Sequence, residues 1–312
     1  MKATPIVGVH SFSSVGVARY CRSLASELVA SGVDYRLSRI AARYSHLHFA
    51  NSCRLEMAPF IVWPQPFLVT VHDARPRDGR LMPAYHRLIY PRILRRAARV
   101  IAHSQFTADM IEELCGVESL VIPHPVLVSG DTDRLRARTA LRWPRQGRIA
   151  VLPGVVKPAK MVEEALTACS RTGWQLVLAG AVTTECATSA QSRGVIVLDR
   201  PSDSDYLLAL AAADLVLVLR ADSVGETNGP LLDAIGAGRA LLATTVGSAP
   251  ELAQGAGLFV EPTEEAIAIA LCAMTQREQE KLEAGARQLA LRYLKADWAR
   301  AHARLFTEVW GQ

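Results

Sequence analysis

The stretch at residues 219–251 reads LRADSVGETNGPLLDAIGAGRALLATTVGSAPE and indicates the architecture of the chain. It follows LVLVL at residues 215–219, an apolar run of strand length, and continues as a polar loop, a short helix, a second strand and a glycine turn. Pro230 opens the helix at its favoured first position, and Gly236 and Gly238 close it. This order of elements is typical of an α/β sheet whose strands are joined by helices.

The loop GETNG, residues 225–229, predicts an anion site. A small polar loop at a helix start points backbone N–H groups outward, and the helix dipole adds positive potential there. Glu226 and Asp233 bring carboxylates to the same place, and carboxylates suit the hydroxyls of a sugar or a ribose. The segment therefore predicts half of a nucleotide-sugar site.

The composition indicates a globular chain of two domains. With 312 residues, half of them hydrophobic, the chain is long for one domain and can bury a large core. Its apolar runs are too short to span a bilayer, and its N-terminal residues lack the core of a signal peptide, so we expect a cytoplasmic protein. The six cysteines form no CxxC pair, which favours reduced thiols over a zinc site or disulfides. The net charge of +5 fits nucleotide diphosphates, anionic lipids or nucleic acid and does not choose among them.

Strands and helices alternate in two blocks. The first block has expected strands at residues 5–10, 35–40, 67–72, 99–104 and 120–123. The second block has them at residues 149–152, 175–179, 195–198, 215–219, 240–244 and 258–260. Such alternation predicts parallel sheets with right-handed crossovers, whose ligands bind at the carboxyl ends of the strands. Between the blocks we expect a charged, irregular linker at residues 131–147.

Several short motifs occur in an order that resembles a known family. They are SSVGVARY at 13–20, VHD at 71–73, IAHSQFT at 101–107, VIPHPV at 121–126, GVVKPAK at 154–160, LAG at 178–180 and GETNG at 225–229. On these motifs the chain resembles retaining glycosyltransferases of the GT-B fold, specifically glycosyltransferase family 4, in the branch with a GETSG-like loop. The resemblance covers nearly the whole chain, and it rests on the order and spacing of the motifs together.

The resemblance implies an α/β protein with two Rossmann-like domains that face each other across a cleft. The expected parts are a short acceptor-side domain at 1–130, a linker at 131–147, a nucleotide-sugar-binding domain at 148–295, and a C-terminal helix at 296–312 that crosses back to the first domain.

The resemblance also implies a retaining, metal-independent transferase with no cofactor. It would move a sugar, hexosyl in kind, from a UDP- or GDP-linked donor to a hydroxyl of a glycan, a lipid-linked acceptor or a natural product. No DxD motif is present, and no enzymatic nucleophile is evident, which favours a same-face displacement in which the leaving phosphate helps to deprotonate the acceptor. The arginine- and alanine-rich composition is typical of a bacterium with a GC-rich genome.

The resemblance assigns roles to residues of this chain. The catalytic candidates are His72, Lys160 and Glu226. The donor-binding candidates are Gly16, Gly154, Lys157, Lys160, Gly180, Leu198, Arg200, Glu226, Thr227, Asn228, Gly229 and Asp233. The acceptor-side candidates are His10, Ser14, Arg19 and His103. Lys160 and the N–H groups of the loop would stabilise the charge that develops on the leaving diphosphate. No metal site is expected, because His46 and His48 alternate along a strand without a third ligand.

Three departures from the family pattern stand out. Val155 replaces an arginine before the lysine, so one phosphate contact is missing, which Lys157 could replace. Only six residues, 227–232, separate Glu226 from Asp233, where the family has seven between two glutamates. The region 44–66 is trimmed, which indicates a small or open acceptor side.

Each site residue also has a plainer interpretation. Lys160 and Asp233 could lie in solvent, and Glu226 could cap a helix or solvate its loop. Gly16 could serve only a tight turn, and His103, like His124, could be a packed histidine at a strand end.

The region 75–99 carries eight arginines and one acid, Asp78. It could dock on an anionic membrane beside a lipid-linked acceptor, with the protein at the inner face of the membrane. It could also be a solvated helix whose apolar stripe packs on the sheet, which we favour. Nucleic acid is not expected, since no known nucleic-acid-binding module accompanies the charges.

Two other classes of function stay open beside the transferase. One is another GT-B enzyme, such as a nucleotide-sugar epimerase. The other is a non-catalytic GT-B scaffold of a glycan pathway, which the missing arginine and the altered acidic pair would fit.

Overall fold

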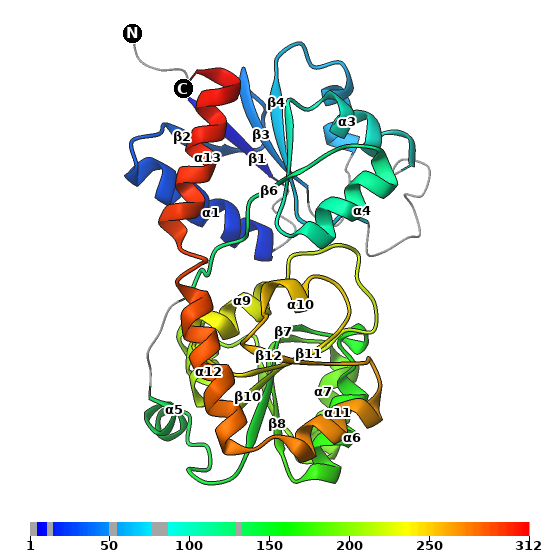
Figure 1. Cartoon of the computed structure of the whole chain (residues 1–312), viewed down its shortest axis with the longest axis vertical. Helices are drawn as coiled ribbons and strands as arrows, with labels where there is room; N and C mark the ends of the chain where they lie inside the picture. The colour runs from blue at the N-terminus through cyan, green and yellow to red at the C-terminus, as the bar shows by residue number, and fades with distance from the viewer. Residues whose placement is uncertain (1–4, 11–14, 50–54, 76–86, 129–132, 312) are drawn as a thin grey trace. The chain divides into compact units, whose positions relative to one another are not determined.

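The computed structural model describes residues 5–10, 15–49, 55–75, 87–128 and 133–311. The contacts divide the chain into two units. Unit 1 comprises Met1–Pro125, Val224–Thr227 and Tyr293–Gln312, and unit 2 comprises Val126–Ser223 and Asn228–Arg292. Each unit is built on one six-stranded sheet (Figure 1).

The sheet of unit 1 has the order β2-β1-β3-β4-β5-β6, and its neighbouring strands are parallel. The strands are β1 (Ile6–His10), β2 (Tyr35–Ser38), β3 (Tyr44–Phe49), β4 (Phe67–Val71), β5 (Arg99–Ala102) and β6 (Leu120–Val121). Only β3 was not among the expected strands. Its sequence, YSHLHF, mixes polar and apolar residues, yet five of its six residues are buried.

Helices cover both faces of this sheet. Helix α1 (Val15–Ala30) packs beside α13 (Lys295–Trp310) in a core that contains Tyr20, Trp298 and Phe306 (Figure 1). The opposite face carries η1 (Leu55–Ile61), α3 (Tyr90–Arg96) and α4 (Gln105–Cys115). The C-terminal helix therefore belongs to unit 1, although most of the chain between residues 126 and 292, which belongs to unit 2, precedes it.

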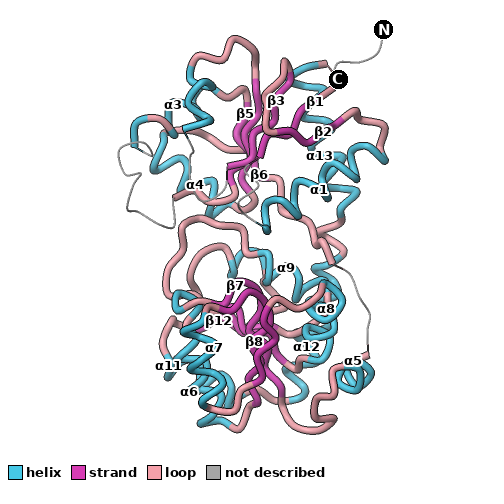
Figure 2. Tube along the Cα trace, turned by 180° about the vertical axis from the view of Figure 1, so that it is seen from behind, coloured by secondary structure: helices cyan, strands magenta, loops and turns pink. Residues whose placement is uncertain are grey.

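The sheet of unit 2 has the order β12-β11-β10-β7-β8-β9 and is also parallel. The strands are β7 (Ile149–Val156), β8 (Gln175–Val182), β9 (Ile196–Asp199), β10 (Leu215–Val218), β11 (Leu241–Thr244) and β12 (Gly257–Val260). One face packs on α6 (Val162–Thr172), α7 (Thr184–Ser192) and α11 (Glu264–Ala273) (Figure 2). The other packs on α8 (Asp203–Ala212) and α9 (Gly229–Gly236), with α12 (Gln276–Ala290) against α9. The short elements η2 (Pro158–Lys160) and α10 (Ala249–Leu252) also belong to this unit.

The stretch 131–147, expected to be irregular, contains helix α5 (Arg134–Ala140). Buried charges explain the difference. Arg138 is 3% exposed, donates from Nε to the carbonyl of Ala212 at 3.0 Å and forms an ion pair with Asp214. Asp214 also accepts from the backbone N–H of Ile149 at 2.7 Å. The charges of this stretch thus anchor it to unit 2 rather than solvate it.

The two parallel sheets with flanking helices confirm the predicted fold class, a pair of Rossmann-like units. Among the described residues, no helix combines the length and apolar character that a bilayer crossing requires. The cysteines Cys21, Cys115, Cys169 and Cys186 are buried free thiols, and Cys272 is exposed.

Candidate functional site

Two predicted glycines lie side by side at the carboxyl ends of β7 and β8. Gly154 and Gly180 are register partners, with φ of 93° and 143°. A Cβ on Gly180 would lie 1.9 Å from the carbonyl oxygen of Gly154, and one on Gly154 would lie 2.6 Å from Cγ of Pro230. Only glycine allows this close approach, which brings the first turn of α9 against the end of β7.

The two predicted lysines follow β7 directly. Lys157 precedes η2, and Lys160 ends it. Lys160 is 7% exposed, and a buried ammonium is costly unless anionic or polar groups compensate it. Val155, at the place of the family's arginine, is 57% exposed. The edge of unit 2 therefore keeps one buried cation and lacks the family's arginine.

Helix α9 presents a carboxylate and an amide at the same edge. Asp233 is 6% exposed and accepts a hydrogen bond from the hydroxyl of Tyr206 at 3.1 Å. Asn228 is the N-cap residue of α9 and is 3% exposed, and its Oδ1 has no partner within the described part of the chain. Gly229 begins the helix. Tyr206 is a neighbour that the sequence does not indicate, because it stands on α8, 27 residues before Asp233.

The turn after β9 is tied to the end of β8. The backbone N–H of Arg200 donates to the carbonyl of Gly180 at 2.7 Å, and Oδ1 of Asp199 accepts from the N–H of Val182 at 2.9 Å. Arg200 has a positive φ of 44°, and its exposed guanidinium forms an ion pair with Asp199. Leu198 is half-buried beside this turn. Gly154, Lys160, Gly180, Leu198, Arg200 and Asp233 thus all belong to unit 2.

The loop Val224–Thr227 clusters with unit 1 instead. Its Val224 carbonyl accepts from the N–H of Arg75 at 2.9 Å, and the N–H of Thr227 donates to the carbonyl of His72 at 3.2 Å. Gly225 has φ of 73°, and a Cβ there would lie 2.6 Å from that of Ala74. The glycine therefore lets the loop lie against the residues that follow β4.

Glu226 is held inside this loop. Its side chain is 3% exposed, and Oε2 accepts from the backbone N–H of Val224 at 2.8 Å. Beside it, the hydroxyl of Thr227 is buried without a partner in the described ranges.

His72 follows β4 at the carboxyl edge of unit 1. Its N–H donates to the carbonyl of Phe49 at 2.8 Å, and its Nε2 lies 3.3 Å from Nδ1 of His48. Its ring meets the ring of Tyr20 edge-on, with centroids 4.7 Å apart.

The residues predicted on the acceptor side, together with Gly16, differ in burial and in their surroundings. His103 is fully buried, and Nδ1 lies 2.9 Å from the carbonyl of Ile122. Burial lowers the pKa of His103 to about 4, so the ring is neutral at pH 7 and donates from Nδ1. Arg19 is half-buried on α1, and Gly16 is exposed near the start of that helix, where an added Cβ would meet nothing within 4 Å. His10 ends β1, and Ser14 lies outside the described residues.

His124, which follows β6, joins the same edge. Its Nδ1 lies 2.7 Å from the carbonyl of Pro125, and burial, followed by the nearby His103, lowers its pKa to about 3. Although histidines gather here, the described residues include no group of three or more His, Cys, Asp or Glu that could hold a metal ion.

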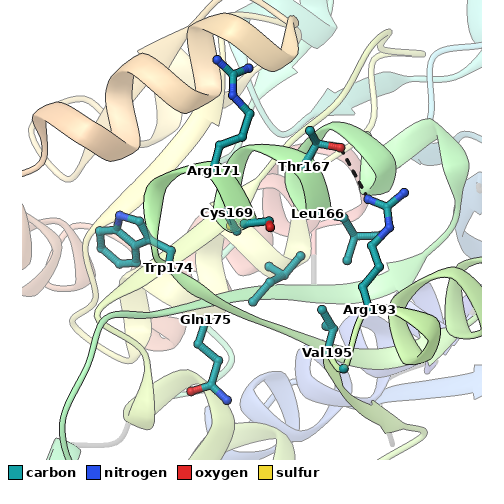
Figure 3. A pocket seen from close by; sticks show the side chains of 11 residues that line it. Leu166, Thr167, Cys169, Arg171, Trp174, Gln175, Arg193 and Val195 are labelled. Atoms are coloured by element: carbon teal, nitrogen blue, oxygen red, sulfur yellow. Dashed lines mark hydrogen bonds between the residues drawn. The ribbon is translucent and has the colours of Figure 1, made fainter.

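A cavity of about 430 Å³ lies at the opposite, amino edge of the unit 2 sheet (Figure 3). Trp174 and Gln175 line it where β8 begins, and Val195 lines it just before β9. Its arginines are already paired: Arg171 with Glu264 and Glu265, and Arg193 with Glu163 and Thr167. None of the predicted site residues lines this cavity, and α/β sheets bind ligands at the other edge.

Comparisons with known proteins agree with this architecture. The model of Glycosyltransferase Family 4 matches residues 35–129. The structure is similar to sucrose-phosphate synthase from Thermosynechococcus elongatus, with a TM-score of 0.81 and 14% identity over 99% of this chain and 100% of that one. It is similar to Anabaena HepE in complex with UDP and glucose (TM-score 0.77, 14% identity, 98% and 100%) and to a glycosyltransferase from Rickettsia africae (TM-score 0.75, 15% identity, 99% and 98%). A sequence search among curated proteins finds no match.

The two sheets and their helices are those of the GT-B class. Together with the family-model match over residues 35–129, they confirm the resemblance to glycosyltransferase family 4.

Proposed function

We propose that this protein is a retaining, metal-independent glycosyltransferase that uses a nucleotide-diphospho sugar as donor. The observation that carries the proposal is the carboxyl edge of unit 2. There Gly154 and Gly180 bring the start of α9 against the sheet, and Lys160 and Asp233 are buried in the same unit. A helix start with a nearby cation suits a diphosphate, and a buried carboxylate suits ribose hydroxyls.

In this proposal Lys160 and the first turn of α9 stabilise the leaving diphosphate. The bond between the anomeric carbon and the phosphate oxygen breaks, and the acceptor oxygen bonds to that carbon from the same face. The acceptor proton passes to the departing phosphate. Asp233, oriented by Tyr206, binds the ribose, and His72 and Glu226 contact the transferred sugar. His103 and Arg19 contact the acceptor.

A UDP-linked sugar is the donor to test first. Among the similar structures, HepE was solved with UDP-glucose and the pneumococcal O-GlcNAc transferase GtfA with UDP and GlcNAc. A panel of UDP-, GDP- and dTDP-sugars, assayed for hydrolysis and transfer, identifies the base and the sugar. NMR of the product then shows whether the anomeric configuration is retained.

Lys160→Ala and its control Lys281→Ala, an exposed lysine on α12, give the matched comparison. We expect donor turnover to fall about 100-fold in Lys160→Ala and to stay unchanged in Lys281→Ala. Turnover of no donor by the wild-type protein would contradict the proposal.

A non-catalytic scaffold is the second candidate, and Val155 favours it because a phosphate contact is missing there. UDP or GDP binding without turnover of any donor supports the scaffold. Conversion of a UDP-sugar into its epimer would instead indicate the epimerase class.

The exposed arginines of α3 raise the question whether the acceptor is lipid-linked or soluble. Ile93 and Leu94 are buried in the core, so the apolar stripe of the helix needs no membrane, while Leu88 is 54% exposed beside the arginines. A lipid-linked acceptor would place the arginine face of α3 on the anionic inner leaflet, and a soluble acceptor would leave the protein in the cytoplasm. Flotation with anionic vesicles distinguishes these two possibilities. Absence of vesicle binding at low salt would contradict membrane docking through this face.

A further inference from the structure

Ser104 and Thr107, the two hydroxyl residues of the IAHSQFT motif, have no part in the proposed function. Both are buried at the start of α4, each with 1% of its surface exposed. Ser104 is the N-cap residue of this helix, and its Oγ accepts from the backbone N–H of Thr107 at 3.1 Å. The cap uses the backbone of Thr107, so the buried hydroxyl of Thr107 requires a separate explanation.

The hydroxyl of Thr107 reaches the GETNG loop. It donates to the carbonyl oxygen of Gly225 at 3.2 Å, although the two residues are 118 positions apart in the sequence. A carbonyl can only accept, so this bond uses the single hydroxyl proton of Thr107. Oγ of Ser104, 2.8 Å from Oγ1 of Thr107, must then be the donor of the bond between the two hydroxyls. The N-cap serine therefore orients the threonine, and the threonine holds the loop.

Close packing at Gly225 brings the loop within reach of this hydroxyl. Met110 follows Thr107 by about one turn of α4, so the two side chains share one face of the helix. A Cβ on Gly225 would lie 2.8 Å from Sδ of Met110 and 2.6 Å from Cβ of Ala74. Helix α4 therefore contacts the loop both by packing and by the hydrogen bond from Thr107, and only glycine fits at position 225.

Two backbone hydrogen bonds flank the bond from Thr107. The carbonyl of Val224 accepts from the N–H of Arg75 at 2.9 Å, and the N–H of Thr227 donates to the carbonyl of His72 at 3.2 Å. Both of these bonds run to the residues that follow β4, whereas Thr107 approaches from α4. Of the three bonds, the one from Thr107 is made by a side chain, and a substitution can therefore remove it alone.

The bond from Thr107 acts on the residue next to Gly225. The carbonyl of Gly225 and the backbone N–H of Glu226 belong to one planar peptide unit, so a bond to the carbonyl sets the plane of that unit. The carboxylate of Glu226 is fixed to the same loop, because its Oε2 accepts from the N–H of Val224 at 2.8 Å. The hydroxyl of Thr107 therefore helps to set the backbone from which the Glu226 side chain extends.

We propose that Ser104 and Thr107 are positioning residues that hold the peptide unit between Gly225 and Glu226 and thereby orient the carboxylate of Glu226. The consequence for catalysis rests on the proposed function, in which Glu226 contacts the transferred sugar. The hold on the loop is a property of the protein without ligand. If the two residues only capped α4, loss of the Thr107 hydroxyl would leave the loop unchanged, because the cap uses the backbone N–H.

Hydrogen exchange of the full-length Thr107→Val protein, followed by NMR, tests the proposal. Valine keeps the β-branched shape and the capped N–H but lacks the hydroxyl. We expect the amides of Val224 and Thr227 to exchange about tenfold faster, as for the loss of one hydrogen bond, while the amides of α4 stay unchanged. Thr107→Ser retains a hydroxyl and should exchange like the wild type.

A second variant and a control accompany this pair. Ser104→Gly removes the hydroxyl that orients Thr107, and glycine is itself a tolerated N-cap residue, so we expect a smaller change of the same sign at the loop. This variant also provides the test if Thr107→Val does not fold. Thr139→Val is the matched control, because Thr139 is exposed and its hydroxyl donates within its own helix, to the carbonyl of Leu135 at 2.8 Å. It should leave the loop unchanged.

Donor turnover tests the consequence for Glu226. We expect kcat to fall about tenfold in Thr107→Val with little change in the KM of the donor, and to recover in Thr107→Ser, because a misplaced group at the reacting sugar weakens the transition state. Unchanged exchange of Val224 and Thr227 in both Thr107→Val and Ser104→Gly, or an unchanged kcat beside faster exchange, would overturn the proposal. Faster exchange in the variants of a protein whose wild type turns over no donor would instead contradict the proposed function alone.

Discussion

The two units share a six-stranded parallel plan and fill it with different chemistry. All eight histidines of the sequence, at positions 10, 46, 48, 72, 86, 103, 124 and 302, belong to unit 1. Unit 2 has none, and it buries alanine, leucine and valine on one side and an arginine–carboxylate cluster on the other. The shared fold therefore fixes the positions of the strand ends. The residues at those ends determine how the stability of each unit depends on pH and whether the unit can bind anions.

The largest expected difference between the units is in their stability at low pH. Burial lowers the pKa values of His103 and His302 from 6.5 to about 4 and that of His124 to about 3. The unfolded chain therefore binds protons first, and stability that is present above pH 6.5 is lost as the pH falls toward 4. One such group costs about 3 kcal/mol over this window. Hydrogen exchange from pH 7 to 4 should show unit 1 opening first, and earlier opening of unit 2 would contradict the comparison.

Removal of a buried charge should affect unit 2 nearly as much. Arg138→Ala leaves Asp214 and three carbonyls, of Ala212, Arg145 and Gly147, short of a donor, and we expect a loss of about 3–5 kcal/mol in the free energy of unfolding.

Arg171→Ala is the control for that variant, because its pair with Glu264 is half-exposed. It should cost less than about 1 kcal/mol. Urea unfolding measures both, and equal midpoints for the two variants would refute the role given to the buried cluster.

Lys160→Ala should weaken the proposed diphosphate site at the carboxyl edge of unit 2 and lower the free energy of unfolding less than Arg138→Ala does. We expect the transfer barrier to rise by about 3 kcal/mol, with donor turnover as the measurement. Wild-type turnover in the Lys160→Ala protein would show that Lys160 does not stabilise the leaving diphosphate.

Tyr206→Phe should have the smallest effect. It removes the hydrogen bond that orients Asp233 at 3.1 Å, and we expect UDP affinity to fall about tenfold by calorimetry. Tyr44→Phe in unit 1 serves as the control, and an unchanged Kd in Tyr206→Phe would show that Asp233 does not need this partner.

The sequence predicts the strands of unit 2 well, because runs such as LVLVL at 215–219 are apolar throughout and stay buried on both faces. It does not predict β3, since the burial of His46 and His48 depends on Tyr35, which only the fold brings to them. The charges of 131–147 mislead for the same reason: their partners, Asp214 and Glu283, are far along the chain.

The site shows the same limit. Gly154, Gly180 and Asp233 can be chosen from motif and spacing, because close packing at a strand end requires glycine and an acidic residue stands out on an apolar helix. Tyr206 and the hydrogen bonds of Tyr35 with His46 and His48 could not be chosen this way, since no local pattern joins α8 to α9 or β2 to β3. Nor does spacing along the chain show that Val224–Thr227 clusters with unit 1 while Asn228 clusters with unit 2.

Hydrogen exchange of the full chain with and without UDP or GDP tests whether the carboxyl edge of unit 2 binds the donor. We expect protection at the end of β7 and the start of α9, at the carboxyl edge of unit 2, and no change around Trp174 at its amino edge. Protection by neither nucleotide at Gly154–Lys160 and Gly229–Asp233 would contradict the assignment of this edge as the donor site.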